Sequence, residues 1–266
     1  MPLVDVHAHF HHPAGARADW AERNASRLDA GERIGITAHV ASILGSWGRT
    51  SPTYFPSMRD VVTGNDALLA LMRDVPARIH GYACVNPNYT EHALGEIARC
   101  LAAGMIGIKL AASRRANDPL LDPIADAARK HQVPILQHVW QHRRKEWPGQ
   151  EASDGAELGE LARRHPDVAF ILAHIGGGGD WSHTLEVTRD IENVFIDLSG
   201  SGVDSGMLES CLAVVGAGRL LWGCDLTMDT GWAKLLYLER IVSPRDLDRI
   251  RWTNAAAIFP AGVFDR

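Results

Sequence analysis

Several features that assign a protein to a class are scarce or missing in this sequence of 266 residues. It has only four cysteines, Cys84, Cys100, Cys211 and Cys224, and no Cys-x-x-Cys pair. Cysteines spaced so widely indicate reduced thiols rather than a disulfide framework or a cysteine-rich zinc site. No basic segment followed by an apolar stretch opens the chain, so no signal peptide is predicted and a cytoplasmic location is expected.

An excess of positive charge and long apolar runs are also missing. The net charge is -5, which gives no basic surface for nucleic acid. No apolar run approaches the roughly 18 residues that cross a membrane. A small molecule is therefore the expected partner, and a homodimer is the commonest assembly for a soluble enzyme.

Strand-like and helix-like segments alternate along the whole chain, as in βα units on a parallel sheet. The predicted strands are 3–7, 36–43, 79–85, 105–109, 133–138, 168–174, 194–198 and 219–224. The predicted helices are 22–33, 66–75, 91–103, 119–131, 156–165, 182–191 and 206–216, with further helices beginning at Ser243 and Asn254. The length is close to the roughly 250 residues of one (β/α)8 barrel. A single TIM-barrel domain over 1–266 is predicted.

Two long connections interrupt the alternation. Residues 10–21 and 45–65 are rich in Gly, Pro, Ser and aromatic residues. Loops of this length in a compact domain are usually functional. We expect them to cover the site as specificity elements or a lid.

Six residues that can bind or serve a metal stand at or just past the ends of predicted strands. They are His7, His9, Lys109, His138, His174 and Asp225. In a strand, positions i and i+2 point to the same side, so both imidazoles of the His-x-His pair can reach one ion. Active sites of (β/α)8 barrels lie at this end of the strands.

Imidazoles plus a carboxylate are typical ligands of catalytic zinc. His7, His9, His138 and Asp225 are the candidate ligands, and Zn²⁺ is the expected ion. A divalent metal can lower the pKa of bound water from about 15.7 to about 7. Asp225 is then the candidate general base, while His174 could polarise a substrate oxygen or bind a second metal.

These residues lie in motifs that resemble the amidohydrolase superfamily, most nearly its amidohydrolase 2 branch. The motifs are Asp5-x-His7-x-His9, Gly107-Ile108-Lys109-Leu110, His138, Leu172-Ala173-His174-Ile175-Gly176-Gly177, Asp197-Leu198-Ser199-Gly200, Trp222-Gly223-Cys224-Asp225 and the segment from Asn254 to Phe259. The resemblance implies a metal-dependent TIM-barrel hydrolase or a non-oxidative decarboxylase, although some relatives are lactonases that need no metal. The branch usually has serine where this chain has Cys224.

The resemblance leaves two roles open for Lys109. In binuclear relatives a lysine at this strand is carboxylated and bridges two metals. In the amidohydrolase 2 branch the lysine commonly accompanies one metal and can stay cationic to bind a carboxylate or oxyanion. We expect one ion, with two if Lys109 is carboxylated.

The expected reaction is hydrolysis of a C–N or C–O bond in a small carbonyl or carboxylate compound. Asp225 would act as the base, and His174 and Lys109 would stabilise the oxyanion. The alternative is metal-dependent decarboxylation of an aromatic or muconate-like acid, and the third hypothesis is a barrel that binds a metabolite without catalysis.

Other side chains receive narrower predictions. Three tryptophans are expected to line the substrate pocket, namely Trp47, Trp140 and Trp181. The glycine-rich stretch 175–181 lacks the spacing of a phosphate loop and is expected to make room beside His174. Core or supporting roles are expected for His39, His80, Asp5 and Asp197, and Asp5 is also a candidate to orient the imidazoles. The loop residues His11 and His12 are left between solvent and substrate contact.

Overall fold

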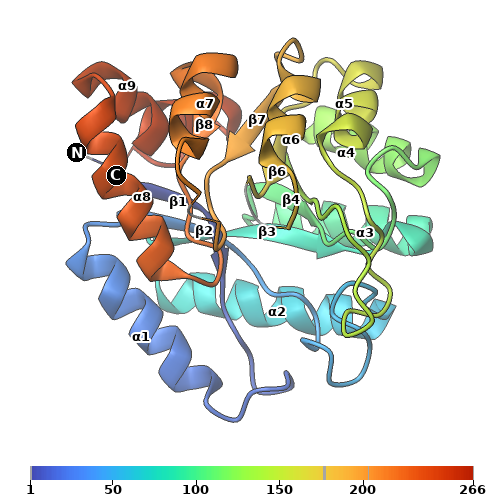
Figure 1. Ribbon diagram of the computed structural model, residues 1–266. Helices are drawn as coiled ribbons and strands as arrows, with labels where there is room; N and C mark the ends of the chain where they lie inside the picture. The colour runs from blue at the N-terminus through green and yellow to red at the C-terminus, as the bar shows by residue number, and fades with distance from the viewer. Residues whose placement is uncertain (1, 176–177, 203, 266) are drawn as a thin grey trace.

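The structure of the chain is a computed structural model that describes residues 2–175, 178–202 and 204–265. The described residues form one sheet of eight parallel strands in the order β1 to β8, with helices around it (Figure 1). The strands are β1 (Val4–His9), β2 (Ala38–Ser42), β3 (Ile79–Val85), β4 (Gly107–Leu110), β5 (Ile135–His138), β6 (Phe170–Ala173), β7 (Val194–Asp197) and β8 (Leu220–Leu221). The predicted TIM barrel is confirmed.

The helices follow the strands in sequence and cover the outside of the barrel (Figure 1). They are α1 (Trp20–Arg33), α2 (Met58–Asp74), α3 (Thr90–Ala102), α4 (Asp122–His131), α5 (Gly155–Arg164), α6 (Trp181–Thr188), α7 (Met207–Val214), α8 (Met228–Ile241), α9 (Pro244–Asp248) and α10 (Asn254–Ile258). Short helical turns also occur at η1 (Pro87–Tyr89), η2 (Pro119–Leu121), η3 (Ala217–Arg219) and η4 (Arg249–Thr253).

The sheet closes on itself where the end of the eighth strand meets β1. The Val6 N–H donates to the Trp222 carbonyl at 3.1 Å, and the Asp225 N–H donates to the His7 carbonyl at 2.7 Å. Elsewhere each strand pairs in parallel with the next, so that His138 lies opposite Ala173. Closure brings the carboxyl ends of all the strands to one end of the barrel.

Apolar side chains fill both the barrel and the layer between sheet and helices. Inside the barrel, Val6, Val40 and Leu136 are among the buried residues that pack with Tyr82. The Tyr82 hydroxyl donates to the Val6 carbonyl at 2.8 Å, which satisfies its only polar atom. Outside, residues such as Ile108 join the larger core beneath the helices.

Two helices correct the sequence-based assignment. Helix α2 begins at Met58 rather than at 66, because the Ser57 hydroxyl accepts the Asp60 N–H and caps the helix. The connection after β2 is therefore shorter than predicted. Helix α8 was not predicted, because Gly231 in its first turn weakens the helical pattern. The predicted start at Ser243 is confirmed, since its hydroxyl accepts the Asp246 N–H at the start of α9.

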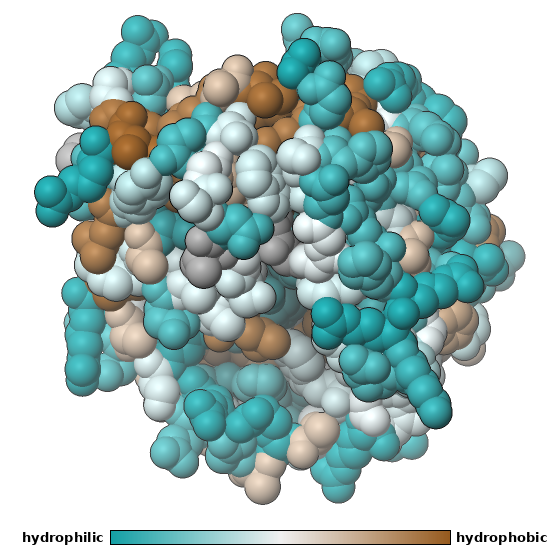
Figure 2. Space-filling view, in the orientation of Figure 1, coloured by the Kyte–Doolittle hydropathy of each residue, from teal (hydrophilic) through white to brown (hydrophobic). Residues whose placement is uncertain are grey.

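The outer surface is mixed in character. Teal hydrophilic side chains cover most of the face in Figure 2, and brown hydrophobic residues gather along its upper edge. Among the described residues, no helix is long and apolar enough to cross a membrane.

Gly107 provides a test of packing inside the barrel. A Cβ at this position would lie 2.5 Å and 2.7 Å from two atoms of the Tyr82 ring. Gly107→Ala should therefore lower the free energy of unfolding by about 1–3 kcal/mol, the usual cost of overpacking. Gly95→Ala on α3 is the control, because nothing lies within 4 Å of its added Cβ. Urea denaturation should show no loss for the control, and equal effects of the two substitutions would contradict the packing argument.

Candidate active site

The His-x-His pair lies at the end of β1 with its two imidazoles facing each other. The Nε2 atoms of His7 and His9 are 3.1 Å apart, and both side chains are buried. Burial is the main cause that holds the pKa of His7 well below its ordinary value, and the charge on Lys109 adds to it. His7 is therefore neutral at pH 7, as a metal ligand must be.

The outer nitrogens of the two rings determine which nitrogens carry protons. His7 Nδ1 lies 2.7 Å from Asp197 Oδ2 and 3.0 Å from Ser199 Oγ, and His9 Nδ1 lies 3.2 Å from the Ser42 carbonyl oxygen. A carboxylate and a carbonyl accept only, so both Nδ1 atoms donate. The lone pairs of both Nε2 atoms then face each other, and the Lys109 amine contacts only that of His7, so a cation shared by both nitrogens would relieve the repulsion. The pair fits a divalent metal on these grounds.

Asp225 completes a group of three candidate ligands. Its Oδ1 lies 3.2 Å from His9 Nε2 and 3.8 Å from His7 Nε2, and the three ligand atoms lie within 4.8 Å of one another. Burial alone would raise the pKa of Asp225, but the imidazoles of His7, His174 and His9 hold it well below its usual range. The carboxylate is therefore ionised.

The backbone of Asp225 is held in an uncommon conformation. Its φ is 57°, in the left-handed region that costs a residue with a side chain about 1 kcal/mol or more. Arg27 Nη1 donates to the Asp225 carbonyl at 2.6 Å, and the Asp225 N–H donates to His7. These two bonds aim the carboxylate at the imidazoles.

The structure places His174 close to this group and pairs His138 with another residue. His174 Nε2 is 3.4 Å from Asp225 Oδ2, and its ring stacks on that of His7 at 5.6 Å. His138 Nε2 lies 2.9 Å from the side-chain nitrogen of Gln150. Both histidines line the same cavity, and burial is the first cause of the lowered pKa of each. A ligand role for His138 stays a prediction.

Lys109 reaches the group from β4. Its Nζ lies 3.1 Å from His7 Nε2, and the residue is only 1% exposed. Burial lowers the pKa of Lys109 to about 8, so the amine is mostly charged at pH 7 and has a neutral fraction. Its position suits both the cationic and the carboxylated form.

These side chains surround a cavity of about 60 Å³ at the carboxyl end of the barrel. It is lined by His9, Leu44, Trp47, Tyr54, Lys109, Ala111, His138, His174, Asp225 and Leu226. Trp47 therefore lies where the sequence predicted. Tyr54 and Leu226 were not predicted, because neither sits at a strand position that periodicity could mark. Burial is the main cause that raises the pKa of Tyr54 to about 12, so its phenol stays protonated.

Trp140 and Trp181 do not line this cavity, and their predicted contact with substrate stays a prediction. β5 ends at His138, so strand alternation no longer carries Trp140 into the barrel. Its ring stacks against His138 with centroids 6.2 Å apart. The Trp181 indole donates to Asp204 Oδ2 at 2.9 Å, away from the candidate ligands. Both line a neighbouring crevice that also includes His174.

The loop after β5 packs against the loop after β2 at the mouth of the cavity, and both lie at the lower right of Figure 1. The rings of Tyr54 and Trp147 are 5.7 Å apart. The Arg144 guanidinium lies 4.6 Å from the centre of the Trp147 ring and 5.0 Å from that of Trp140. Arg144 thus stacks on two aromatic rings.

The glycine-rich stretch can be assessed only in part, because Gly176 and Gly177 lie outside the described residues. A Cβ on Gly178 would lie 2.3 Å from the Trp140 ring, so this glycine makes room for Trp140. Room beside His174 is provided by Gly200, where a Cβ would lie 3.1 Å from the imidazole.

Asp5, His39 and His80 have supporting contacts in the core. Asp5 Oδ1 accepts the backbone N–H groups of His7 and Cys224, so Asp5 does not contact the His-x-His imidazoles. His39 Nδ1 lies 3.1 Å from Asp5 Oδ2 in the core. His80 packs edge-on against a phenylalanine ring.

Of the two loop histidines, neither lines the cavity. His12 Nε2 donates to the Gly45 carbonyl at 2.5 Å, and the His11 ring lies against Trp47. They join the loops after β1 and β2. Asp197 has a larger role than predicted, because it orients a candidate ligand.

The fold and the site together define a (β/α)8-barrel enzyme with its functional groups at the strand ends. The chain belongs to the Amidohydrolase family, whose model matches residues 4–261, and this confirms the resemblance noted in the sequence. No curated protein matches the chain.

Solved structures with the same fold include several decarboxylases. 2,6-Dihydroxybenzoate decarboxylase from Rhizobium has a TM-score of 0.74 at 17% identity, over 97% of this chain and 98% of its own. Dihydroxybenzoic acid decarboxylase from a Polaromonas species, with bound manganese and 2-nitroresorcinol, has a TM-score of 0.71 at 16% identity, over 97% and 96%. 5-Carboxyvanillate decarboxylase from Sphingomonas paucimobilis has a TM-score of 0.71 at 16% identity, over 97% and 98%.

Asp197 provides a test of how the candidate ligands are oriented. Its carboxylate accepts from the His7 ring and from the Ser199 hydroxyl and N–H. Asp197→Asn should weaken divalent-metal binding by about 10–100-fold, because the amide can no longer accept from all three donors. Titration of chelator-treated protein with Mn²⁺ and Zn²⁺ measures the change. Asp126→Asn on the exposed face of α4 is the control, and equal affinities of the two variants would contradict the orienting role.

The buried imidazoles predict how stability depends on pH. Burial is the first cause of the lowered pKa of His7, His39, His138 and His174. Below pH 6.5 the unfolded chain binds protons that the folded chain does not, so stability falls as pH falls, by about 1 kcal/mol per histidine at pH 5.5. Burial raises the pKa of Asp197 to about 6, which opposes the effect of about one histidine.

For metal-free protein we therefore expect a loss of about 3 kcal/mol between pH 7.5 and 5.5. Urea denaturation with a chelator present measures it at both values. A free energy of unfolding that did not change would mean that the imidazoles bind protons equally in the folded and unfolded states.

Proposed function

We propose that this enzyme is a metal-dependent, non-oxidative decarboxylase of an aromatic carboxylic acid. The observation that carries the proposal is the composition of the cavity. Candidate metal ligands and the amine of Lys109 lie together with aromatic and apolar walls, including Trp47, Tyr54 and Leu226. Such a cavity can bind the carboxylate of a substrate through its positive charge and the flat ring of the same substrate through its apolar walls.

The cavity volume of about 60 Å³ limits how a substrate can bind. This space holds a few water molecules or one carboxylate. The carboxylate would therefore point toward Lys109, and the ring would lie toward Leu226, which is 53% exposed at the mouth. The neighbouring decarboxylases act on 2,6-dihydroxybenzoate and 5-carboxyvanillate, which have this shape and charge.

His7, His9 and Asp225 are the residues that would hold the metal, with His174 beside them. A divalent ion there would supply a Lewis acid that polarises a substrate oxygen. Nitrogen and carboxylate donors suit either Zn²⁺ or Mn²⁺, and the Polaromonas neighbour contains manganese. We infer one ion, because Lys109 is mostly cationic at neutral pH.

Loss of carbon dioxide from R–COO⁻ breaks the C–C bond and requires one proton at the carbon that remains. Asp225 Oδ2 and His174 Nε2 are 3.4 Å apart, so a proton can be held between them. The ionised carboxylate of Asp225 would take this proton from solvent, share it with His174 and give it to the carbon as carbon dioxide leaves. Lys109 would bind the substrate carboxylate before it leaves as carbon dioxide.

Hydrolysis of a C–N or C–O bond is the second candidate function. The observation that favours it is the ionised carboxylate of Asp225 beside the neutral imidazole of His7, because this arrangement can accept a proton from water. The two reactions share their residues and differ in product, so a product assay separates them.

The test measures metal content and then product. Protein with one equivalent of Mn²⁺ or Zn²⁺ is offered 2,6-dihydroxybenzoate, 5-carboxyvanillate and a panel of lactones and amides. We expect carbon dioxide release, and we expect Asp225→Asn to lower kcat by about 10²–10⁴-fold. Asp126→Asn is the control. Hydrolysis of lactones or amides without carbon dioxide release would reject the decarboxylase, and two metal equivalents would indicate a carboxylated Lys109.

A further inference from the structure

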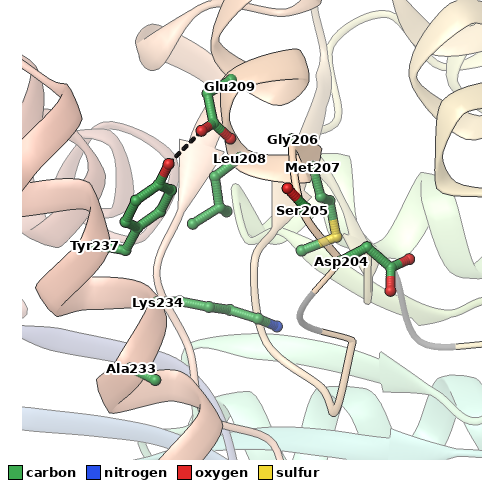
Figure 3. Close-up of a pocket in the computed structure, with 9 residues that line it drawn as sticks. All are labelled: Asp204, Ser205, Gly206, Met207, Leu208, Glu209, Ala233, Lys234 and Tyr237. Carbon is green, nitrogen blue, oxygen red and sulfur yellow. Dashed lines mark hydrogen bonds between the residues drawn. The ribbon is translucent and has the colours of Figure 1, made fainter.

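Lys234 on α8 lines a second pocket, but its ammonium group points away from that pocket. The pocket lies between α7 and α8 and has a volume of about 370 Å³ (Figure 3). Its lining includes Leu208, Glu209 and Tyr237. In Figure 3 the nitrogen of Lys234 points away from Tyr237, and the residue is only 3% exposed.

The ammonium group of Lys234 is fully used by backbone oxygens. Nζ donates to the carbonyls of Leu198 at 2.8 Å, Ser199 at 3.2 Å and Gly200 at 2.9 Å. A lysine ammonium has three N–H donors, so none remains for a ligand in the pocket. Three successive carbonyls held by one buried cation fix the path of the chain just beyond β7.

Two of these three residues, Ser199 and Gly200, also lie beside candidate site histidines. The Ser199 hydroxyl lies 3.0 Å from His7 Nδ1 and donates to Asp197 Oδ2 at 2.6 Å. Gly200 lies against the other histidine, since a Cβ there would be 3.1 Å from the His174 ring. A shift of this segment would therefore move the hydrogen-bond partners of His7 and the wall behind His174 together.

Helix α8 is itself tied to the end of the eighth strand. The Trp222 indole donates to the Gly231 carbonyl at 2.9 Å, and a Cβ on Gly231 would lie 2.8 Å from Cys224 Sγ. The helix begins three residues after Asp225. Helix α8 thus contacts the chain beyond both strands, and through Lys234 it fixes their relative position. Asp197 lies at the end of β7, and Asp225 follows β8.

We propose that Lys234 is a positioning residue, which holds the segment 198–200 so that His7 and His174 keep their orientation toward Asp225. The proposal rests on the proposed metal-dependent function for its consequence, but the positioning itself is a property of the metal-free protein. It assigns Lys234 to the active site although the side chain touches none of the candidate ligands.

The test observes the imidazoles directly in metal-free protein. Histidine ¹⁵N and Nδ1–H resonances are recorded with chelator present for wild type, Lys234→Met and the control Tyr237→Phe. The control also changes α8, where Tyr237 lies. It removes the hydroxyl that donates to Glu209 in the same pocket. We expect the His7 and His174 resonances to shift in Lys234→Met and to stay in place in Tyr237→Phe.

Metal titration of the same samples adds a second readout. Lys234→Met should raise the apparent Kd for Mn²⁺ roughly tenfold, as loss of supporting contacts does at metal sites, and the control should match wild type. Unchanged imidazole resonances in a folded Lys234→Met would overturn the proposal. If that variant does not fold, Lys234→Gln decides by the same resonances, because it keeps a donor on a shorter side chain. A wild type that binds no metal would reject the proposed function, while the resonances would still decide the role of Lys234.

Discussion

The buried carboxylate of Asp5 is the interaction on which barrel and site both depend. β8 has only two residues, so few backbone bonds join it to β1. Asp5 adds to them by accepting the N–H groups of both His7 and Cys224 on Oδ1. Arg27 and His39 contact its other oxygen at 2.8 Å and 3.1 Å. A buried carboxylate is tolerated only with such partners. Burial alone would raise its pKa, but Arg27 and His39 outweigh it, so the pKa of Asp5 is lowered.

The same network extends into the site through Arg27. One of its nitrogens bonds Asp5 and another bonds the Asp225 carbonyl, so one guanidinium links barrel closure to the position of a candidate ligand. A planar guanidinium can make both bonds at once, which an ammonium group could not do in the same geometry. The left-handed backbone of Asp225 is thus stabilised by contacts that form only when the barrel is closed. Barrel closure and the position of the Asp225 backbone therefore depend on the same side chain.

Sequence alone predicted the parts of the site that follow strand periodicity. Strand alternation and the barrel fold fix where residues at strand ends point. They therefore predicted His7 and His9 at the end of β1, Lys109 on β4, His174 after β6 and Asp225 after Cys224. Periodicity fails once the chain leaves a strand, and so Tyr54 was overlooked. Long-range partners also leave no local pattern: Asp197 and His7 are 190 residues apart, yet they form a bond of 2.7 Å.

The strand ends and the two loops at the cavity mouth are held in place by different contacts. The candidate ligands stand on strand ends that buried cations hold from outside, Arg27 on one side and Lys234 on the other. The cavity mouth instead depends on two loops, joined by the contact of Tyr54 with Trp147 and by Gly149, where a Cβ would lie 2.4 Å from Phe55. The same loops also reach the candidate ligands, since the Tyr54 ring lies 5.0 Å from that of His138 and the Gln150 side chain lies 2.9 Å from His138 Nε2. A (β/α)8 barrel can keep the side chains at its strand ends while the loops above them change.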